Sequence, residues 1–136
     1  MESKVEKPKV GVDVIIRKDD MVLLHERKDN NGNVVWHVPG GHLEFLEEVG
    51  DCAKREVKEE MGIDIKDIKI AKVMNNIYDN PPIHYVVFYV ESFLDYGEPK
   101  IMEPNKCTDV RWFKPTEFPT NLFPSLQRLV DTGYFK

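Results

Sequence analysis

One segment, Glu47 to Met61, has the hydrophobic period of an α-helix, whereas the chain on both sides of it has the composition of β-strands. Its apolar residues recur every four positions, at Val49, Ala53, Val57 and Met61. Lys54 and Lys58 lie beyond one edge of this stripe, and Gly62 follows directly, as is usual where a helix ends in the left-handed conformation. The segment therefore predicts one helix that packs its stripe on a sheet and leaves both lysines in solvent.

Segments rich in β-branched and aromatic residues predict strands at Val10–Arg17, Met21–Arg27, Val35–Val38, Ile63–Tyr78, His84–Phe93 and Val110–Phe113. Turns are predicted at Asp19-Asp20 and Asp79–Pro82, and polar loops at Lys28–Val35 and Tyr96–Thr108. A second helix is predicted over Leu122–Val130. This order of elements predicts an α/β fold, an α/β/α sandwich with a mixed sheet between helices.

The chain has 136 residues and a net charge of −5. It shows no internal repeat and no shift in composition, so we expect a single domain over residues 1–136 with a flexible segment at residues 1–8. An acidic chain gains no general attraction to nucleic acid or anionic lipid, and no apolar run is long enough to span a membrane. We therefore expect no polymeric nucleic acid and no membrane as partners.

The first eight residues are charged and lack the apolar core of a secretory signal. The two cysteines, Cys52 and Cys107, have neither metal-ligand spacing nor the density of a disulfide-rich domain. We expect reduced, partly buried thiols in a cytoplasmic protein.

Three glutamates, Glu56, Glu59 and Glu60, fall within an arc of roughly 100° on the predicted helix. They lie beside the apolar stripe, so their carboxylates should repel one another along the protein body unless a cation is bound. Oxygen-only ligands suit magnesium or manganese. Taken alone, the same spacing also fits the solvated face of a helix rich in glutamate and lysine.

The sequence around these glutamates resembles the 23-residue Nudix box over Gly41–Ile63. The resemblance holds at each fixed position, namely Gly41, Glu47, Arg55-Glu56-Val57, Glu59-Glu60 and Gly62-Ile63. It implies a Nudix-type sandwich in which Glu56, Glu59 and Glu60 bind Mg²⁺ or Mn²⁺, and the backbone carbonyl of Gly40 adds a further ligand.

The resemblance also implies that Arg55 orients the catalytic glutamates and that Glu47 supports the metal shell. Glu59, Glu56, Arg55 and Glu47 are thus the expected catalytic residues. The metal would neutralise charge on diphosphate oxygens and acidify a water, and a carboxylate would take the proton. Two positions depart from the family pattern, Leu46 where glycine is common and Glu48 where serine or threonine is common, which affects the loop shape and the helix cap but no ligand.

Weaker similarities to the MutT-related branch continue at Pro39–Phe45, Asn75-Asn76, His84–Val86, Glu103–Cys107, Trp112-Phe113 and Leu122-Phe123. They imply an enzyme that cleaves a (deoxy)nucleoside triphosphate to the monophosphate and diphosphate. The alternatives are hydrolysis of ADP-ribose, another nucleoside-diphosphate derivative or a prenyl diphosphate, and a non-catalytic nucleotide-binding module. A homodimer is common among relatives.

Three further residues are candidates for substrate binding. Phe123 could stack on a base or pack in the core, and His42 could contact a phosphate or be a plain loop histidine. Glu103 could supply an extra carboxylate or be a solvated loop residue.

Overall fold

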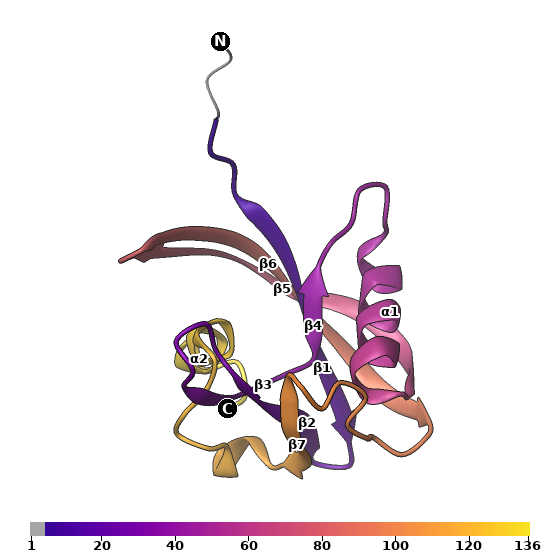
Figure 1. Cartoon of the computed structure of the whole chain (residues 1–136). Helices are drawn as coiled ribbons and strands as arrows, with labels where there is room; N and C mark the ends of the chain where they lie inside the picture. Colours follow the sequence, from indigo (N-terminus) through magenta and orange to yellow (C-terminus); the bar gives the residue numbers. More distant parts are fainter. Residues whose placement is uncertain (1–4) are drawn as a thin grey trace.

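The computed structural model describes residues 5–136, so the expectation of a flexible segment at residues 1–8 falls partly outside the described residues. The elements are β1 (Lys9–Lys18), β2 (Met21–Lys28), β3 (Val34–His37), β4 (Gly40–His42), α1 (Val49–Met61), β5 (Asp64–Asp79), β6 (Pro82–Tyr96), β7 (Cys107–Phe113), a 3₁₀ turn (Pro115–Glu117) and α2 (Pro124–Asp131) (Figure 1). No helix of this described part is long and apolar enough to cross a membrane.

The strands form one mixed sheet in the order β3-β2-β1-β6-β5, with β4 paired to β1 and β7 paired to β2. β1 and β6 are parallel, and the other pairs are antiparallel. Figure 1 shows α1 and α2 on opposite sides of this sheet. The predicted α/β class, with a mixed sheet between helices, is thereby confirmed.

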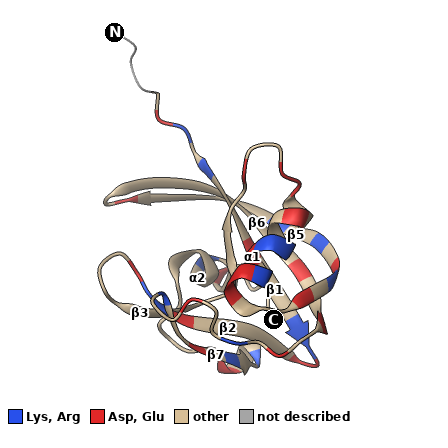
Figure 2. Ribbon diagram, turned by 45° about the vertical axis from the view of Figure 1, so that its right-hand side comes forward, with Lys and Arg blue, Asp and Glu red and all other residues tan. Residues whose placement is uncertain are grey.

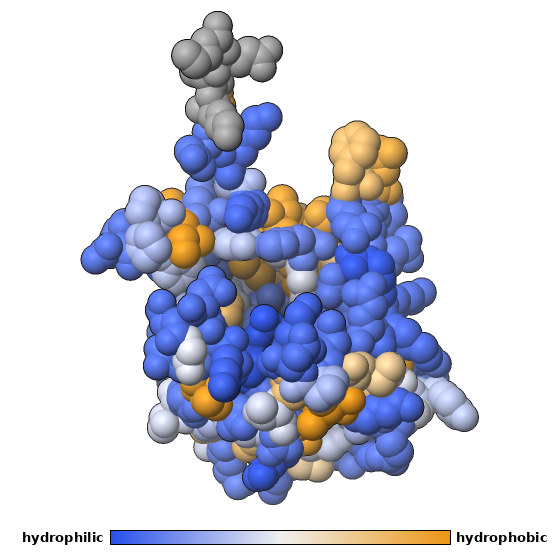
Figure 3. Space-filling model, in the orientation of Figure 1, coloured by the Kyte–Doolittle hydropathy of each residue, from blue (hydrophilic) through white to orange (hydrophobic). Residues whose placement is uncertain are grey.

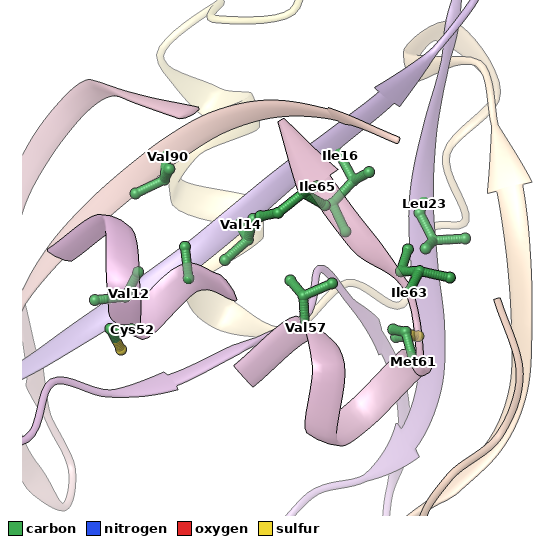
Figure 4. Close-up of a cluster of buried hydrophobic side chains, with 11 residues drawn as sticks. Val12, Val14, Ile16, Leu23, Cys52, Val57, Met61, Ile63, Ile65 and Val90 are labelled. Carbon is green, nitrogen blue, oxygen red and sulfur yellow. The ribbon is translucent and has the colours of Figure 1, made fainter. Parts of the chain in front are cut away.

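The core on the α1 side is built as the helical stripe predicts. Ala53, Val57 and Met61 are fully buried and pack in one cluster with Val12 and Val14 of β1 (Figure 4). The fourth residue of the predicted stripe, Val49, is only half-buried, because it lies in the first turn of the helix. Lys54 and Lys58, beyond the edge of the stripe, are exposed as predicted. The rotation of α1 about its axis therefore agrees with the prediction.

A second core lies between the sheet and α2. Tyr89 of β6 is fully buried there with Leu126 and Leu129 of α2. The helix starts at Pro124 rather than at Leu122, because Phe123 has the extended conformation of an N-cap and proline fits the first helical turn. Leu122 forms a bridge to Trp36 instead.

Two further local features, both next to the site, differ from the prediction. α1 begins at Val49, so Glu47 lies in the preceding loop and Glu48 is the N-cap. Gly40–His42, for which no strand was predicted, forms the short strand β4 because its backbone pairs with residues 11–13 of β1. This pairing places β4 beside α1, and it positions the site described next.

Candidate active site

Two consecutive glycines in β4 make room for the carboxylates of α1. A Cβ atom on Gly41 would lie 2.4 Å from Cδ of Glu56, and a Cβ atom on Gly40 would lie 2.1 Å from the backbone oxygen of Val12. Gly40 is thus required by the close approach of β4 to β1, and Gly41 by the close approach of β4 to a carboxylate. The two glycines form a cradle that any larger side chain would fill.

Glu60 lies at the floor of this cradle. The backbone N–H of Gly40 donates to Oε2 of Glu60 at 3.2 Å, and Nε2 of His25 lies 3.8 Å from its Oε1. Burial, followed by a hydrogen bond and charge repulsion from Glu56, raises the pKa of Glu60 to about 9. Burial also lowers the pKa of His25 to about 3, so a neutral imidazole faces this carboxyl group. His25 therefore supplies no positive charge to the two close carboxylates of Glu56 and Glu60.

Arg55 holds the other side of the site together. It donates from Nε to Oε2 of Glu47 at 2.8 Å and from Nη2 to Oε1 at 3.0 Å, and its Nη1 donates to Oε1 of Glu56 at 2.7 Å. Nη1 also lies 3.5 Å from Oε2 of Glu59. The hydrogen bonds from Arg55 lower the pKa of Glu47 to about 2, while those carboxylates raise the pKa of the guanidinium. Arg55 thus fixes the loop before α1 to the helix.

A cavity of about 270 Å³ is lined by His25, Arg27, Gly40, Glu56, Glu59, Glu60, Glu103, Lys106 and Cys107. Of the predicted catalytic residues, Arg55 and Glu47 lie outside this lining. The carboxylate oxygens of the cavity are the donor type that Mg²⁺ and Mn²⁺ prefer. With the side chains placed as they are, no three histidine, cysteine or acidic residues among residues 5–136 are grouped closely enough to surround an ion. The donor chemistry fits a hard divalent cation, although Glu56 is turned towards Arg55.

Of the three candidate substrate-binding residues, Glu103 lines the cavity, where its Oε2 lies 3.5 Å from Nζ of Lys106. His42 and Phe123 do not line it. The exposed His42 ring stacks on Tyr85, and Nε2 lies 2.8 Å from the hydroxyl of Tyr85. Phe123 is half-buried and stacks on His37, with ring centroids 4.3 Å apart.

Four cavity residues were not identified from the sequence: His25, Arg27, Lys106 and Cys107. His25 and Arg27 alternate along β2 after Leu23, which belongs to the core on the α1 side. The period-two spacing from Leu23 is the signal that could have found them, because side chains two residues apart in a strand share a face. Lys106 ends the long loop before β7, and Cys107 is the first residue of β7. The sequence offers no periodicity there, and the similarity of Glu103–Cys107 to the MutT-related branch is the signal that could have found them.

The model of the NUDIX domain family matches residues 7–132. The chain belongs to the Nudix hydrolase family. Nudix hydrolases generally use divalent metal ions, which agrees with the oxygen donors of the cavity. A solved MutT NUDIX hydrolase from Burkholderia pseudomallei is 28% identical, and it superimposes with a TM-score of 0.85 over 93% of this chain and 98% of its own.

Two curated relatives of this Nudix chain carry more specific names. An ADP-ribose pyrophosphatase of Methanocaldococcus jannaschii is 39% identical over 74 residues, which is 54% of this chain and 41% of the relative. An NAD-capped RNA hydrolase, NudC, of Vibrio parahaemolyticus is 30% identical over 108 residues, which is 78% of this chain and 38% of the relative. The chain thus spans about two fifths of the length of each.

Proposed function

We propose that this Nudix chain is a divalent-metal-dependent hydrolase that cleaves a nucleoside triphosphate, or its deoxy form, into the monophosphate and diphosphate. The observation that carries the proposal is the single cavity that gathers the carboxylates of Glu56, Glu59 and Glu60 with the cations Arg27 and Lys106. Carboxylates suit a hard metal ion, and cations suit phosphate oxygens.

Glu56, Glu59, Glu60 and the backbone carbonyl of Gly40 would hold Mg²⁺ or Mn²⁺. A divalent ion held there supplies positive charge to the diphosphate oxygens and increases the acidity of water. The crowding of Glu60 against Glu56 supports this assignment, because a cation would relieve their repulsion.

The remaining groups have separate tasks in this proposal. Glu59 has a 56% exposed side chain and only a 3.5 Å contact with Arg55, so its carboxylate is available to accept the proton of the attacking water. Arg55, held by Glu47, positions Glu56. Arg27 binds phosphate oxygens, since its buried Nε has no hydrogen-bond partner among the described residues.

A second candidate function is hydrolysis of ADP-ribose or of another nucleoside-diphosphate derivative, and the relative from M. jannaschii favours it. The name of the relative from V. parahaemolyticus adds diphosphates linked to RNA. The triphosphate is preferred because the chain resembles the MutT-related branch in several segments outside the box, and a MutT protein superimposes over almost all of its length.

The experiment that tests the proposal is a substrate panel in Mg²⁺ or Mn²⁺, with release of diphosphate and phosphate measured separately. The panel contains nucleoside triphosphates, ADP-ribose, dinucleoside polyphosphates, prenyl diphosphates and NAD-capped RNA. We expect diphosphate release from a nucleoside triphosphate, with a rate that rises into mildly alkaline pH because water must lose a proton.

Each other result has a defined meaning. Turnover in excess chelator would disprove the metal requirement. Cleavage of ADP-ribose alone would select the second candidate, and binding of nucleotides without any turnover would identify a non-catalytic module.

A further inference from the structure

One histidine at the floor of the cavity is enclosed without a hydrogen-bond partner for either ring nitrogen. His25 is 3% exposed, and its Nδ1 and Nε2 both lack a partner among residues 5–136. The hydrophilic groups that cover α1 (blue in Figure 3) can bind solvent, whereas this imidazole cannot. Buried polar atoms without a partner are rare in proteins because they destabilise the fold. The position of His25 therefore lowers stability unless a ligand occupies the cavity beside it.

The imidazole of His25 faces the buried carboxyl group of Glu60. Nε2 of His25 and Oε1 of Glu60 are 3.8 Å apart, which is too long for a hydrogen bond. A single ion can bridge this separation, since imidazole nitrogen and carboxylate oxygen each bind Zn²⁺ at about 2.0–2.2 Å. His25 and Glu60 therefore have the spacing of two ligands of one ion.

The first residue of β7 brings a sulfur atom to the same cavity. Cys107 is 5% exposed and lines the cavity together with His25 and Glu60. It reaches the cavity because β7 pairs with β2, where Cys107 lies opposite Arg27, two residues from His25. Its thiol, a weak donor, makes a 3.4 Å contact with the backbone oxygen of Asp109. The thiol must turn away from Asp109 to reach an ion beside His25, and this weak contact opposes the turn only slightly.

The balance of charge in the cavity favours a cation. Four glutamates line the cavity, and three of them come from α1, whose acidic positions are red in Figure 2. Two basic side chains, those of Arg27 and Lys106, line it as well. The lining is therefore negative when its carboxyl groups are ionised, and a divalent ion would reduce the repulsion among them.

We propose that His25, Glu60 and Cys107 bind a divalent ion of the class of Zn²⁺ and Co²⁺. Nitrogen and sulfur ligands select such ions over Mg²⁺, which takes oxygen ligands. The thiol of Cys107 releases its proton to solvent as the bond between sulfur and metal forms. The inference rests on the proposed function only in that Glu60 serves both ions, so the floor of the cavity holds either a hard ion or an ion of this class.

The test measures binding of Zn²⁺ and of Mg²⁺ by calorimetry, on the full chain without a histidine tag and without nucleotide. His25→Leu removes the nitrogen ligand and Cys107→Ala removes the sulfur ligand. His84→Leu and Cys52→Ala are the matched controls, since both residues lie outside the cavity lining. Circular dichroism and thermal melting in chelator verify that each variant is folded. The absorption spectrum of the Co²⁺ complex of the parent needs no variant, because a bond from cobalt to a thiolate gives a charge-transfer band in the near ultraviolet.

We expect His25→Leu and Cys107→Ala each to raise the Zn²⁺ dissociation constant about 100-fold or more, because loss of a residue that only supports a ligand already raises it about 10–100-fold. The controls should bind Zn²⁺ like the parent, and Mg²⁺ affinity should change by less than about threefold in all four variants. A Zn²⁺ affinity that neither cavity variant changes, or a Co²⁺ complex without the thiolate band, would overturn the proposal. Either result would leave the proposed function standing, since hydrolysis in Mg²⁺ is measured separately with the substrate panel.

Discussion

The two sides of the candidate active site differ in how their charge is balanced. On the loop side, Arg55 pairs with Glu47 and Glu56, and the pKa of Glu47 falls to about 2. At the floor, Glu60 is buried beside Glu56 and a neutral His25, and its pKa rises to about 9. A balanced carboxylate stabilises the fold by itself, whereas an unbalanced one stabilises it only when a proton or a cation is added. The difference separates Glu47, which helps to build the site, from Glu60, which is proposed to bind its metal.

The largest effect should follow from Glu59→Gln, which removes one charge and one proposed ligand while nearly preserving volume. Turnover should fall by a factor of about 10² to 10³, which corresponds to about 3–4 kcal/mol of lost transition-state stabilisation. Stability of the metal-free protein should stay the same or rise slightly, because repulsion among carboxylates falls. Single-turnover kinetics in saturating Mg²⁺ and thermal melting in chelator measure the two effects.

Glu117→Gln is the matched control, since Glu117 is an exposed glutamate outside the cavity. Its rate and stability should both stay within experimental scatter. A normal rate for Glu59→Gln would remove Glu59 from the proposed machinery. A loss of stability with a normal rate per folded molecule would make it a structural ion-pair partner.

Stability in chelator as a function of pH should separate the two sides of the site directly. Glu60 has a raised pKa in the fold, so its contribution is complete below its unfolded value near 4.5 and is lost as the pH rises towards 9. Glu60→Gln should therefore melt several degrees above the parent at pH 8.5 and close to it at pH 4.5. Glu47 has a lowered pKa, so Glu47→Gln should melt below the parent at neutral pH, with a difference that shrinks as the pH falls towards 2. If both variants melted above the parent, or both below it, the comparison between the two sides of the site would be contradicted.

Much of this arrangement follows from the sequence, because helical periodicity fixes both the buried stripe and the carboxylates beside it. Val57 is fully buried and Lys54 is exposed, so the predicted rotation of α1 holds, and with it the direction of Glu56 and Glu60. The roles of these residues stay predictions until the experiments above are done.

The parts that could not be predicted depend on tertiary contacts. β4 contains two glycines and has no strand composition, and it is a strand only because its backbone pairs with β1. His25 and Arg27 become cavity residues only once α1 is known to cover their face of β2. Phe123 lies on the α2 side of the sheet and stacks on His37, so it does not line the cavity although it lies next to the start of a helix.

A smaller loss of stability should follow from Arg55→Lys. The change keeps the positive charge but removes the planar guanidinium group that donates hydrogen bonds to both Glu47 and Glu56. Stability in chelator should fall by about 1–2 kcal/mol, because one ammonium group cannot replace several charge-assisted hydrogen bonds. Arg111→Lys is the control, since Arg111 pairs with Asp109 on the surface with a 65% exposed side chain. That change should stay within about 0.5 kcal/mol in urea denaturation. Equal losses for the two variants would mean that Arg55 is an ordinary surface arginine.

The smallest effect concerns Glu48 at the start of α1, on the balanced side of the site. Glu48 has the extended conformation of an N-cap (φ −74°, ψ 147°), yet its side chain makes no capping hydrogen bond. Aspartate keeps the negative charge that suits a helix N-terminus, and its shorter side chain can accept from the backbone N–H groups of the first turn. Glu48→Asp should therefore raise stability by about 0.5–1 kcal/mol and leave turnover unchanged. Glu48→Ala, which cannot cap, is the control and should show no gain. A lower turnover in Glu48→Asp would show that the cap and the metal-binding glutamates are mechanically coupled, and that the two sides of the site are not independent.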